Sequence, residues 1–287
     1  MSINILVTGA NGQLGKTLKD ESSNLKGEYC FTFVSKAELD ITNPKQIEVF
    51  LEEKEYDYCI NCAAYTKVEQ AEDSAKTAFK VNAEAVKYLG TIFKKTNTVL
   101  IHISTDYVFD GSKNSPYLET DDVNPINVYG KSKFLGEQHV QDILDNYFII
   151  RASWLYSKYG HNFLKTIISK IKQNERLNVI SSQTGTPTSC IDLSKFIFQL
   201  ITTRNTSYGI YNFSANGETT WYDFALFIAK HFPEYNTSKI VPLNEFNTKA
   251  QRPSYSVLDN SKSQQILSNQ SFWQKSADDV IADILNN

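Results

Sequence analysis

The sequence has little of what several classes of protein require. No apolar run approaches the roughly 18 residues that a membrane-spanning helix needs. The formal net charge of -3 over 287 residues leaves no basic footprint for nucleic acid. The segment that begins at Ile3 lacks the charged stretch, apolar stretch and cleavage site of a signal peptide. We therefore expect a cytoplasmic protein without a membrane or nucleic-acid partner.

Cysteine is also scarce, with four residues in the whole chain. Cys59 and Cys62 form C-x-x-C, a spacing found in redox and metal sites. They lie in an apolar, small-residue segment, no second such pair follows, and the four histidines are scattered. We expect these thiols to pack as small hydrophobic side chains, and we expect no metal site.

Apolar strand-like runs alternate with helical patterns through the first half of the chain. The strand patterns cover residues 3–8, 31–34, 58–61, 99–103 and 147–150, and the helical patterns cover 12–18, 43–51, 75–93 and 129–143. Such alternation predicts parallel crossovers and a sheet covered on both faces. The fold class that we expect is α/β, a doubly wound parallel Rossmann sheet with a smaller C-terminal substrate-binding section.

The rhythm loosens after the fifth strand pattern. Helical patterns at 162–171 and 193–201 and a strand pattern at 177–180 precede a more irregular section that ends near 285. We expect residues 1–155 to form an NAD(P)-binding Rossmann core. Residues 156–287 should form mainly a substrate-binding cap, while some of their strands and helices return to the core.

A glycine motif follows the first strand. Gly9 to Gly15 has the spacing G-x-x-G-x-x-G and opens a helix. Glycines permit a tight turn and a close approach of backbone to a pyrophosphate, and a helix N-terminus favours negative charge. An ordinary glycine-rich turn is the alternative. The dinucleotide site predicted here contains Gly9, Asn11, Gly12, Gln13 and Leu14.

The end of the second strand bears on the choice of dinucleotide. An acid there binds the ribose hydroxyls of NAD, and a cation suits the 2′-phosphate of NADP. The strand ends in Val34, Ser35 and Lys36 with no acid, which favours NADPH and leaves NADH possible. Lys36 could also be a solvated surface residue. Asp40 and Ile41 come slightly later and are expected to flank the adenine.

Small and hydroxyl residues follow the third and fourth strands. Ala63, Ala64 and Tyr65 would let a dinucleotide pass close to the sheet edge, where ligands of such folds bind. Ser104 and Thr105 offer hydroxyl donors to the same crevice, and a carbonyl oxygen that gains negative charge needs such a donor. A structural turn or helix cap would use the same residue types.

Tyr129 and Lys133 are four residues apart at the start of a helical pattern. Positions i and i+4 share one helix face. A nearby ammonium favours the phenolate and should lower the tyrosine pKa from its ordinary value of about 10. Tyr129 could then exchange a proton with a carbonyl oxygen. A solvated helix face is the alternative, and the motifs upstream argue against it.

Together these motifs resemble the dTDP-4-dehydrorhamnose reductase family of the extended short-chain dehydrogenase/reductase superfamily. The resemblance covers nearly the whole chain. It rests on residues 12–15, 61–66, 68–72, 104–109, 127–133, 151–156, 183–188 and 252–259.

The resemblance implies reduction of the 4-keto group of a dTDP-6-deoxyhexulose with NAD(P)H, giving dTDP-L-rhamnose. Tyr129 would donate the proton, Lys133 would hold the nicotinamide ribose and Thr105 would hydrogen-bond the reacting sugar oxygen. Ser104 would contact the cofactor, and Tyr129 both cofactor and substrate. The expected sugar-nucleotide pocket contains Val68, Glu69, Thr105, Asp106, Tyr129, Trp154 and Arg252.

The resemblance also bears on assembly. Some family members bind a metal between subunits through acids at the positions of Thr17 and Ile191. Neither residue is an acid here, so we expect no such metal, while a homodimer is possible.

Other functions are open to this fold. A dehydratase of the superfamily usually has an acidic pair after the threonine, whereas Tyr107 follows Asp106 here. A non-catalytic NADP-binding subunit, resembling the regulatory partner of methionine adenosyltransferase, could lose the tyrosine or the lysine. Both are present. Another nucleotide-4-ketosugar reductase also fits the motifs.

Overall fold

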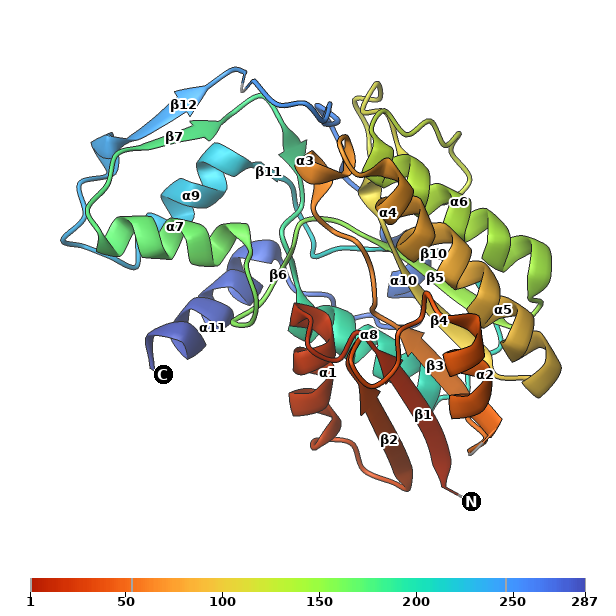
Figure 1. Cartoon of the computed structure of the whole chain (residues 1–287). Coiled ribbons are helices and arrows are strands. Elements are labelled where there is room, and N and C mark those ends of the chain that lie inside the picture. Colours follow the sequence, from red (N-terminus) through yellow and green to blue (C-terminus); the bar gives the residue numbers. More distant parts are fainter. Residues whose placement is uncertain (1, 53, 246, 287) are drawn as a thin grey trace.

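A parallel sheet of six strands forms the centre of the computed structural model, which describes residues 2–52, 54–245 and 247–286 (Figure 1). The strand order is β2-β1-β3-β4-β5-β10, and every neighbouring pair is parallel. The predicted α/β class with a doubly wound parallel sheet is confirmed. The strands are β1 (Ile3–Thr8), β2 (Tyr29–Val34), β3 (Tyr58–Asn61), β4 (Val99–Thr105), β5 (Tyr147–Ala152) and β10 (Gly209–Phe213).

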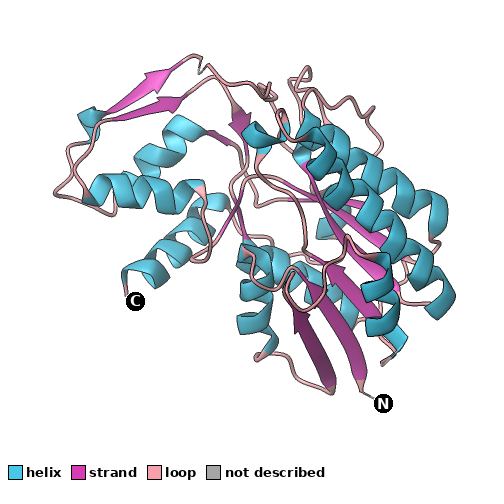
Figure 2. Cartoon of the chain, viewed as in Figure 1, coloured by secondary structure: helices cyan, strands magenta, loops and turns pink. Residues whose placement is uncertain are grey.

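Helices cover both faces of this sheet (Figure 2). Alternate strand residues point to opposite faces, so Ile5 and Val7 share a core with Leu14, while Leu6 shares another with Val86. The first core is closed by α1 (Gln13–Ser22) and α8 (Cys190–Thr202) and the second by α2 (Pro44–Glu52), α5 (Ala85–Thr96) and α6 (Val128–Ile143).

The strand order reverses between β1 and β3, which lie side by side in the sheet. In open α/β sheets, ligands bind beyond the carboxyl ends of the strands at such a reversal. The loops after β1, β2, β3 and β4 lie at this edge, and the residues predicted for cofactor and catalysis lie on these loops, at the end of β4 and at the starts of α1 and α6.

A separate apolar core lies in the C-terminal part of the chain. It is built by α7 (Phe163–Lys172), α9 (Trp221–Ala229), α11 (Trp273–Leu285) and the strand pair β7 (Leu177–Ile180) and β12 (Ile240–Leu243). Figure 1 shows these elements beside the carboxyl edge of the central sheet. The remaining short elements are α3 (Val68–Ala71), α4 (Ala75–Phe79), η1 (Lys80–Glu84), η2 (Asp106–Val108), β6 (Leu155–Tyr156), β8 (Thr184–Gly185), β9 (Thr188–Ser189), β11 (Thr219–Thr220), η3 (Thr237–Lys239) and α10 (Ser261–Gln264).

The long helix expected over residues 75–93 is interrupted. A π-helical turn, η1, separates α4 from α5. The turn brings the carbonyl of Asn82 against α6, where a Cβ added at Gly136 would lie 2.2 Å from that oxygen. Such turns occur frequently at functional sites, and here the turn orients the Asn82 side chain toward the predicted cofactor edge.

A buried ion pair fixes α6 to the sheet. Arg151 on β5 and Glu137 on α6 are 2% and 0% exposed, and their charged atoms lie 2.7 Å apart. Removing one partner of such a pair leaves an uncompensated buried charge, which typically costs about 3–5 kcal/mol. The pair therefore holds in place the helix that carries Tyr129 and Lys133.

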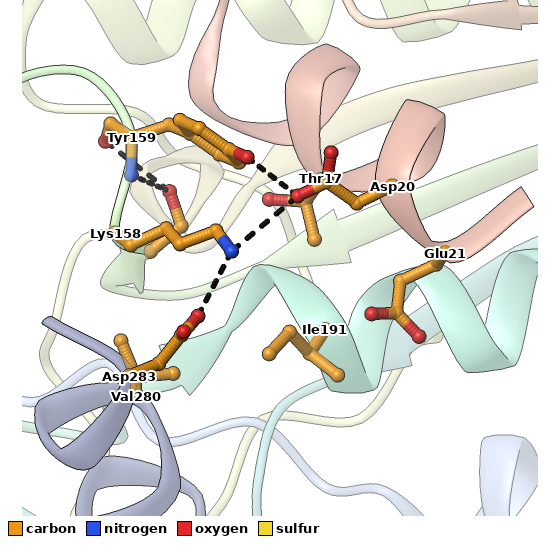
Figure 3. A pocket seen from close by; sticks show the side chains of 9 residues that line it. Thr17, Asp20, Glu21, Lys158, Tyr159, Ile191, Val280 and Asp283 are labelled. Atoms are coloured by element: carbon orange, nitrogen blue, oxygen red, sulfur yellow. Dashed lines mark hydrogen bonds and ion pairs between the residues drawn. The ribbon is translucent and has the colours of Figure 1, made fainter. Parts of the chain in front are cut away.

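A polar cluster joins α1 to α11 beside a cavity of about 40 Å³ (Figure 3). Lys158 Nζ lies 3.5 Å from Asp20 Oδ2 and 3.0 Å from Asp283 Oδ2. Thr17 and Ile191, the two positions discussed for a metal, line the same cavity. Within the described ranges, no group of three or more His, Cys, Asp or Glu side chains is arranged to hold a metal ion.

No helix in the described part of the chain is both long and apolar enough to span a bilayer.

Candidate active site

The start of α6 brings Tyr129 to the end of β4. Asn127 caps the helix, its Oδ1 accepting a hydrogen bond from the Gly130 N–H at 2.8 Å. A Cβ at position 130 would lie 2.2 Å from the Tyr107 carbonyl oxygen. Only glycine allows this approach, which sets the rings of Tyr107 and Tyr129 edge to face at 5.9 Å.

Tyr129 and Thr105 place their hydroxyls together. Thr105 Oγ1 donates to Asp106 Oδ1 and accepts from the Tyr107 N–H, both at 3.1 Å. Burial raises the pKa of Tyr129, and the neighbouring Thr105 hydroxyl lowers it by less. The prediction that Lys133 lowers the tyrosine pKa is wrong for this structure, because burial dominates.

Lys133 lies one helical turn beyond Tyr129 on α6 and is 2% exposed. Its Nζ donates to the Ile103 carbonyl at 2.6 Å and lies 3.4 Å from His102 Nε2. Burial lowers the pKa of Lys133 to about 8, against the opposing effects of Glu137 and Cys62. A fixed cation that has lost most of its water is thus available to a ligand hydroxyl.

His102 belongs to a buried polar chain that the sequence did not reveal. Burial, and then Lys133, hold the pKa of His102 well below its ordinary value, so the imidazole is neutral. Its Nδ1 lies 3.1 Å from Asn61 Nδ2, and Asn61 Oδ1 accepts from Thr8 at 2.7 Å. This series of polar contacts runs across β1, β3 and β4 and ends at Lys133. It limits how the Lys133 ammonium can move.

The glycine loop and the β3 loop pack directly against each other. Gly9 has φ of +67°, and a Cβ there would lie 2.6 Å from the Ala63 backbone nitrogen. Gly12 caps α1 without a side-chain hydrogen bond, so the first-turn N–H groups are available to an anion. Asn11 is exposed beside them. Leu14 is 5% exposed and packs in the core, so only its backbone can face a ligand.

Gln13 has a role beyond the glycine loop. Its Nε2 donates to the Leu155 carbonyl at 3.2 Å, and Asn162 Nδ2 donates to its Oε1 at 3.4 Å. The predicted cofactor loop is therefore tied to the segment that leads into the C-terminal section. Sequence spacing could not show this contact, which joins residues more than a hundred positions apart.

We expected no acid at the end of β2, but the structure places one there. Glu38 reaches back to Ser35, and its Oε2 accepts from both the N–H and the hydroxyl at 2.7 Å each. Lys36 is 81% exposed and lies 3.9 Å from Asp40. Ile41 is 4% exposed and packs in the core. The acid was missed because it lies three residues beyond Ser35 and returns through a turn.

The loop after β3 is held by the π-helical turn. Asn82 accepts from the Tyr65 N–H at 2.8 Å and donates to the Tyr65 carbonyl at 3.0 Å. Its Nδ2 also donates to Ser132 on α6 at 2.9 Å. Ala63 and Ala64 precede Tyr65 and are partly buried. Asn82 thus ties the predicted cofactor loop to the helix that carries Tyr129.

Two buried polar atoms at the end of β4 have no hydrogen-bond partner among the described residues. They are Ser104 Oγ and Asp106 Oδ2. Burial raises the pKa of Asp106 to about 7, and the neighbouring hydroxyls of Ser256 and Thr105 oppose this rise. Buried polar groups are normally paired, so these two atoms fit a site that takes a polar ligand.

The loop that carries Arg252 folds over the start of α6. Glu69 accepts from the Lys249 N–H at 2.6 Å, and Asn127 Nδ2 donates to the Gln251 carbonyl at 2.8 Å. Arg252 reaches Tyr107, where burial raises the tyrosine pKa to about 12 and the guanidinium lowers it. Glu69 therefore holds this loop rather than standing free in a pocket.

Trp154 lies at the junction with the C-terminal section. It has φ of +45° and stacks on Trp221, with ring centroids 3.5 Å apart. A Cβ at Gly185 would lie 2.5 Å from the Trp154 ring. A bulky residue in the left-handed region is strained, and such strain clusters at functional sites. Val68 begins α3 and is partly buried.

Comparison with known proteins agrees with this geometry. A family described as RmlD substrate binding domain matches residues 3–286. The chain belongs to this family. A dTDP-4-dehydrorhamnose reductase from Aggregatibacter actinomycetemcomitans is 37% identical, covering 97% of this chain and 98% of the relative. A dTDP-4-keto-6-deoxy-D-glucose reductase from Streptomyces niveus is 33% identical, covering 88% of this chain and 87% of the relative.

A solved member of the family has nearly the same fold. The dTDP-4-dehydrorhamnose reductase from Bacillus anthracis, in complex with NADP, superposes with a TM-score of 0.92 at 37% identity. The match covers 99% of this chain and 100% of that chain. The RmlD family and its Rossmann architecture, expected from the sequence motifs, are confirmed.

Proposed function

We propose that this protein reduces the 4-keto group of dTDP-4-dehydro-6-deoxy-L-mannose (dTDP-4-dehydrorhamnose) with NADPH, giving dTDP-L-rhamnose. The observation that carries the proposal is the group at the end of β4. Two hydroxyls, those of Tyr129 and Thr105, lie together, and one helical turn beyond Tyr129 the same helix carries a buried lysine. The names of the Aggregatibacter and Bacillus anthracis relatives supply the substrate.

The residues at the sheet edge fit a dinucleotide. The first-turn N–H groups of α1 and the loop from Gly9 would hold the pyrophosphate, and Ser35 and Lys36 the adenosine ribose with its 2′-phosphate. Ala63, Ala64 and Tyr65 would border the cofactor, and Ser104 and Lys133 the nicotinamide half. When bound, the reduced nicotinamide supplies the hydride that reaches the carbonyl carbon.

Each side chain of the site has a separate task. Tyr129 donates its hydroxyl proton to the sugar oxygen. Thr105 would turn its hydroxyl from Asp106 to the same oxygen and donate to it while its charge grows. Lys133 would hold the nicotinamide ribose. Because burial raises the pKa of Tyr129, the tyrosine is protonated before reaction, as a proton donor must be.

The sugar nucleotide would lie between the sheet edge and the C-terminal section. Trp154 offers a flat apolar surface, and Asp106 offers a carboxyl oxygen without a partner among the described residues. The buried Nε of Arg252 also lacks a hydrogen-bond partner in the described part of the chain, which suits a diphosphate. Val68 and Glu69 border this region, Glu69 through its hold on the Arg252 loop.

We also propose that residues 1–155 form the cofactor core and residues 156–287 mainly the substrate cap. The return of α8 and β10 to the central sheet supports the expected exchange between the two parts. A homodimer and a cytoplasmic location stay predictions. Light scattering of the purified chain tests the dimer.

NADPH absorbance tests the reaction. The wild-type chain is offered dTDP-4-keto-6-deoxy sugars and the GDP- and UDP-linked analogues, and the products are assigned by NMR. We expect turnover with the dTDP-linked sugar and rhamnose stereochemistry in the product. A product of different stereochemistry would favour the activity named for the Streptomyces relative. No turnover with any sugar would favour a non-catalytic NADP-binding subunit.

A further inference from the structure

The end of β2 is a closed turn with a carboxylate bound to its donors. Glu38 Oε2 accepts from the Ser35 N–H and from the Ser35 hydroxyl, each at 2.7 Å. Ser35 is 9% exposed, whereas Glu38 is exposed. The serine is therefore fixed by its surroundings, while the carboxylate can move away into solvent.

This turn lies where the adenosine ribose of a dinucleotide is bound. The Ala10 N–H of the glycine loop donates to the Val34 carbonyl at 3.0 Å, which joins the loop to the end of β2. An acid about 20 residues beyond the glycine motif accepts from the ribose 2′-hydroxyl in dinucleotide-binding sheets, and a cation accommodates a 2′-phosphate. Both types of residue are present in this turn.

The donors of Ser35 cannot serve two anions at once. A 2′-phosphate that used the N–H and hydroxyl of Ser35 would have to displace the Glu38 carboxylate. The Lys36 cation is 81% exposed and lies 3.9 Å from Asp40, so a 2′-phosphate would share it with that carboxylate. Hydrogen bonds from Ser35 and the charge of Lys19 lower the pKa of Glu38, and, against the effect of burial, Lys36 and Lys80 help to lower that of Asp40, so both carboxylates of this turn already have cations beside them. A neutral ribose hydroxyl meets no such opposition and can donate to Glu38.

We infer that Glu38 sets the preference between NADPH and NADH by competing with the 2′-phosphate for the two donors of Ser35. The inference rests on the proposed cofactor role of this edge. The carboxylate weakens NADPH binding and supports NADH binding through the 2′-hydroxyl. Ser35 and Lys36 favour the phosphate, and Glu38 opposes them, so the chain accepts both cofactors.

Nucleotide fragments test this without turnover. Titration calorimetry measures the dissociation constants of 2′,5′-ADP and 5′-ADP for wild type, Glu38→Ala and Glu38→Gln. Removing the carboxylate should tighten 2′,5′-ADP about tenfold, the size of one charge-assisted hydrogen-bond contribution. Binding of 5′-ADP should stay the same or weaken. Glu234→Gln, which removes an exposed acid from the C-terminal section, should change neither constant.

A second pair of variants separates competition for donors from simple repulsion. In a Ser35→Ala background the hydroxyl donor is gone. There, Glu38→Ala should tighten 2′,5′-ADP binding by at most about half the fold-change that the same substitution gives when Ser35 is present. Equal gains with and without the hydroxyl would contradict competition. Equal gains for both fragments, or unchanged 2′,5′-ADP binding in both Glu38 variants, would also overturn the inference.

The inference and the proposed reaction can fail separately. If wild type reduces no ketosugar but the Glu38 variants shift the two fragments as expected, the reaction is wrong and the role of Glu38 is supported. If neither fragment binds to wild type, the role of Glu38 and the cofactor assignment are both overturned. In an active enzyme, Glu38→Ala should also raise the NADPH to NADH ratio of kcat/KM about tenfold.

Discussion

The two ends of the proposed cofactor site use lysine in opposite ways. Lys133 is 2% exposed, donates to the Ile103 carbonyl at 2.6 Å and has its pKa lowered to about 8 by burial. Lys36 is 81% exposed and lies 3.9 Å from Asp40. A buried charge is fixed and unscreened, whereas an exposed one is mobile and screened by salt. Substitutions at the buried end should therefore change the rate, and those at the exposed end the cofactor preference.

The largest effect is expected at the buried end from Tyr129→Phe. The variant keeps the ring against Tyr107 but loses the proton donor, so kcat should fall roughly 10²- to 10⁴-fold. The dissociation constant of NADPH should stay within about threefold of wild type, because the hydroxyl is directed at the sugar. Stopped-flow turnover and fluorescence titration of NADPH measure the two quantities. Wild-type turnover in the variant would remove Tyr129 as the acid.

Lys133→Met should lower kcat roughly a hundredfold, because the cation beside the site is lost. The pH dependence of the unfolding free energy gives a second test of the same residue. The pKa of Lys133 is about 8 when folded, against 10.5 for the ordinary group. Between these values the unfolded chain holds a proton that the folded chain has lost, so wild-type stability rises with pH.

The cost of burying the ammonium is therefore complete below pH 8 and fades toward pH 10.5. The unfolding free energy of Lys133→Met relative to wild type should be highest below pH 8 and decline by about 3 kcal/mol across this window. Urea unfolding at several pH values measures the decline. A difference that does not change with pH would show that Lys133 is not a buried cation.

At the exposed end, Lys36→Asp should shift the preference toward NADH about tenfold. The variant exchanges a cation for an anion where a 2′-phosphate would lie, while the buried end is untouched. The kcat with saturating NADH should stay near wild type. The ratio of kcat/KM for the two cofactors is the measurement, and an unchanged ratio would show that Lys36 does not read the 2′-phosphate.

Lys158 lies between these two extremes, since its side chain is 34% exposed and contacts Asp20 and Asp283 (Figure 3). Partly exposed ion pairs contribute about 1 kcal/mol or less. Lys158→Met should therefore lower the unfolding free energy by about 1 kcal/mol and leave kcat unchanged. Thermal unfolding and turnover test this, and a large loss of kcat would give the cluster a part in catalysis.

The smallest effect is expected from EDTA. Thr17 and Ile191 line the cavity beside Lys158 and are not acids, and the chemistry proposed here uses only side chains and cofactor. Activity should survive EDTA treatment within about twofold. A loss that Mg²⁺ restores would contradict the expectation of no metal.

The parts that the sequence could predict are those with local signals. Apolar runs marked the first five strands, and the strand-loop-helix spacing of Gly9 to Gly15 marked the turn that Gly9 makes at positive φ. Tyr129 and Lys133 lie on α6 as their spacing indicated. Each of these features depends on residues that are close together along the chain.

The parts that it missed depend on contacts between distant segments. Asn82 occupies a π-helical turn that a helical period does not distinguish, and its partner Tyr65 is seventeen positions away. In the sequence, His102 is a single polar residue within a strand pattern. Only the folded sheet places it beside Asn61 and Lys133. The expected tyrosine pKa failed for the same reason, because spacing gives a neighbour but not the degree of burial.

A crystal structure of the chain with NADP⁺ and dTDP tests the central claim most directly. The account predicts that Lys133 Nζ lies within about 3 Å of the nicotinamide ribose hydroxyls, with the Tyr129 hydroxyl facing the sugar side. Ser35 and Lys36 should face the adenosine end. A dinucleotide bound away from the end of β4, with Tyr129 and Lys133 contacting neither ligand, would contradict the account.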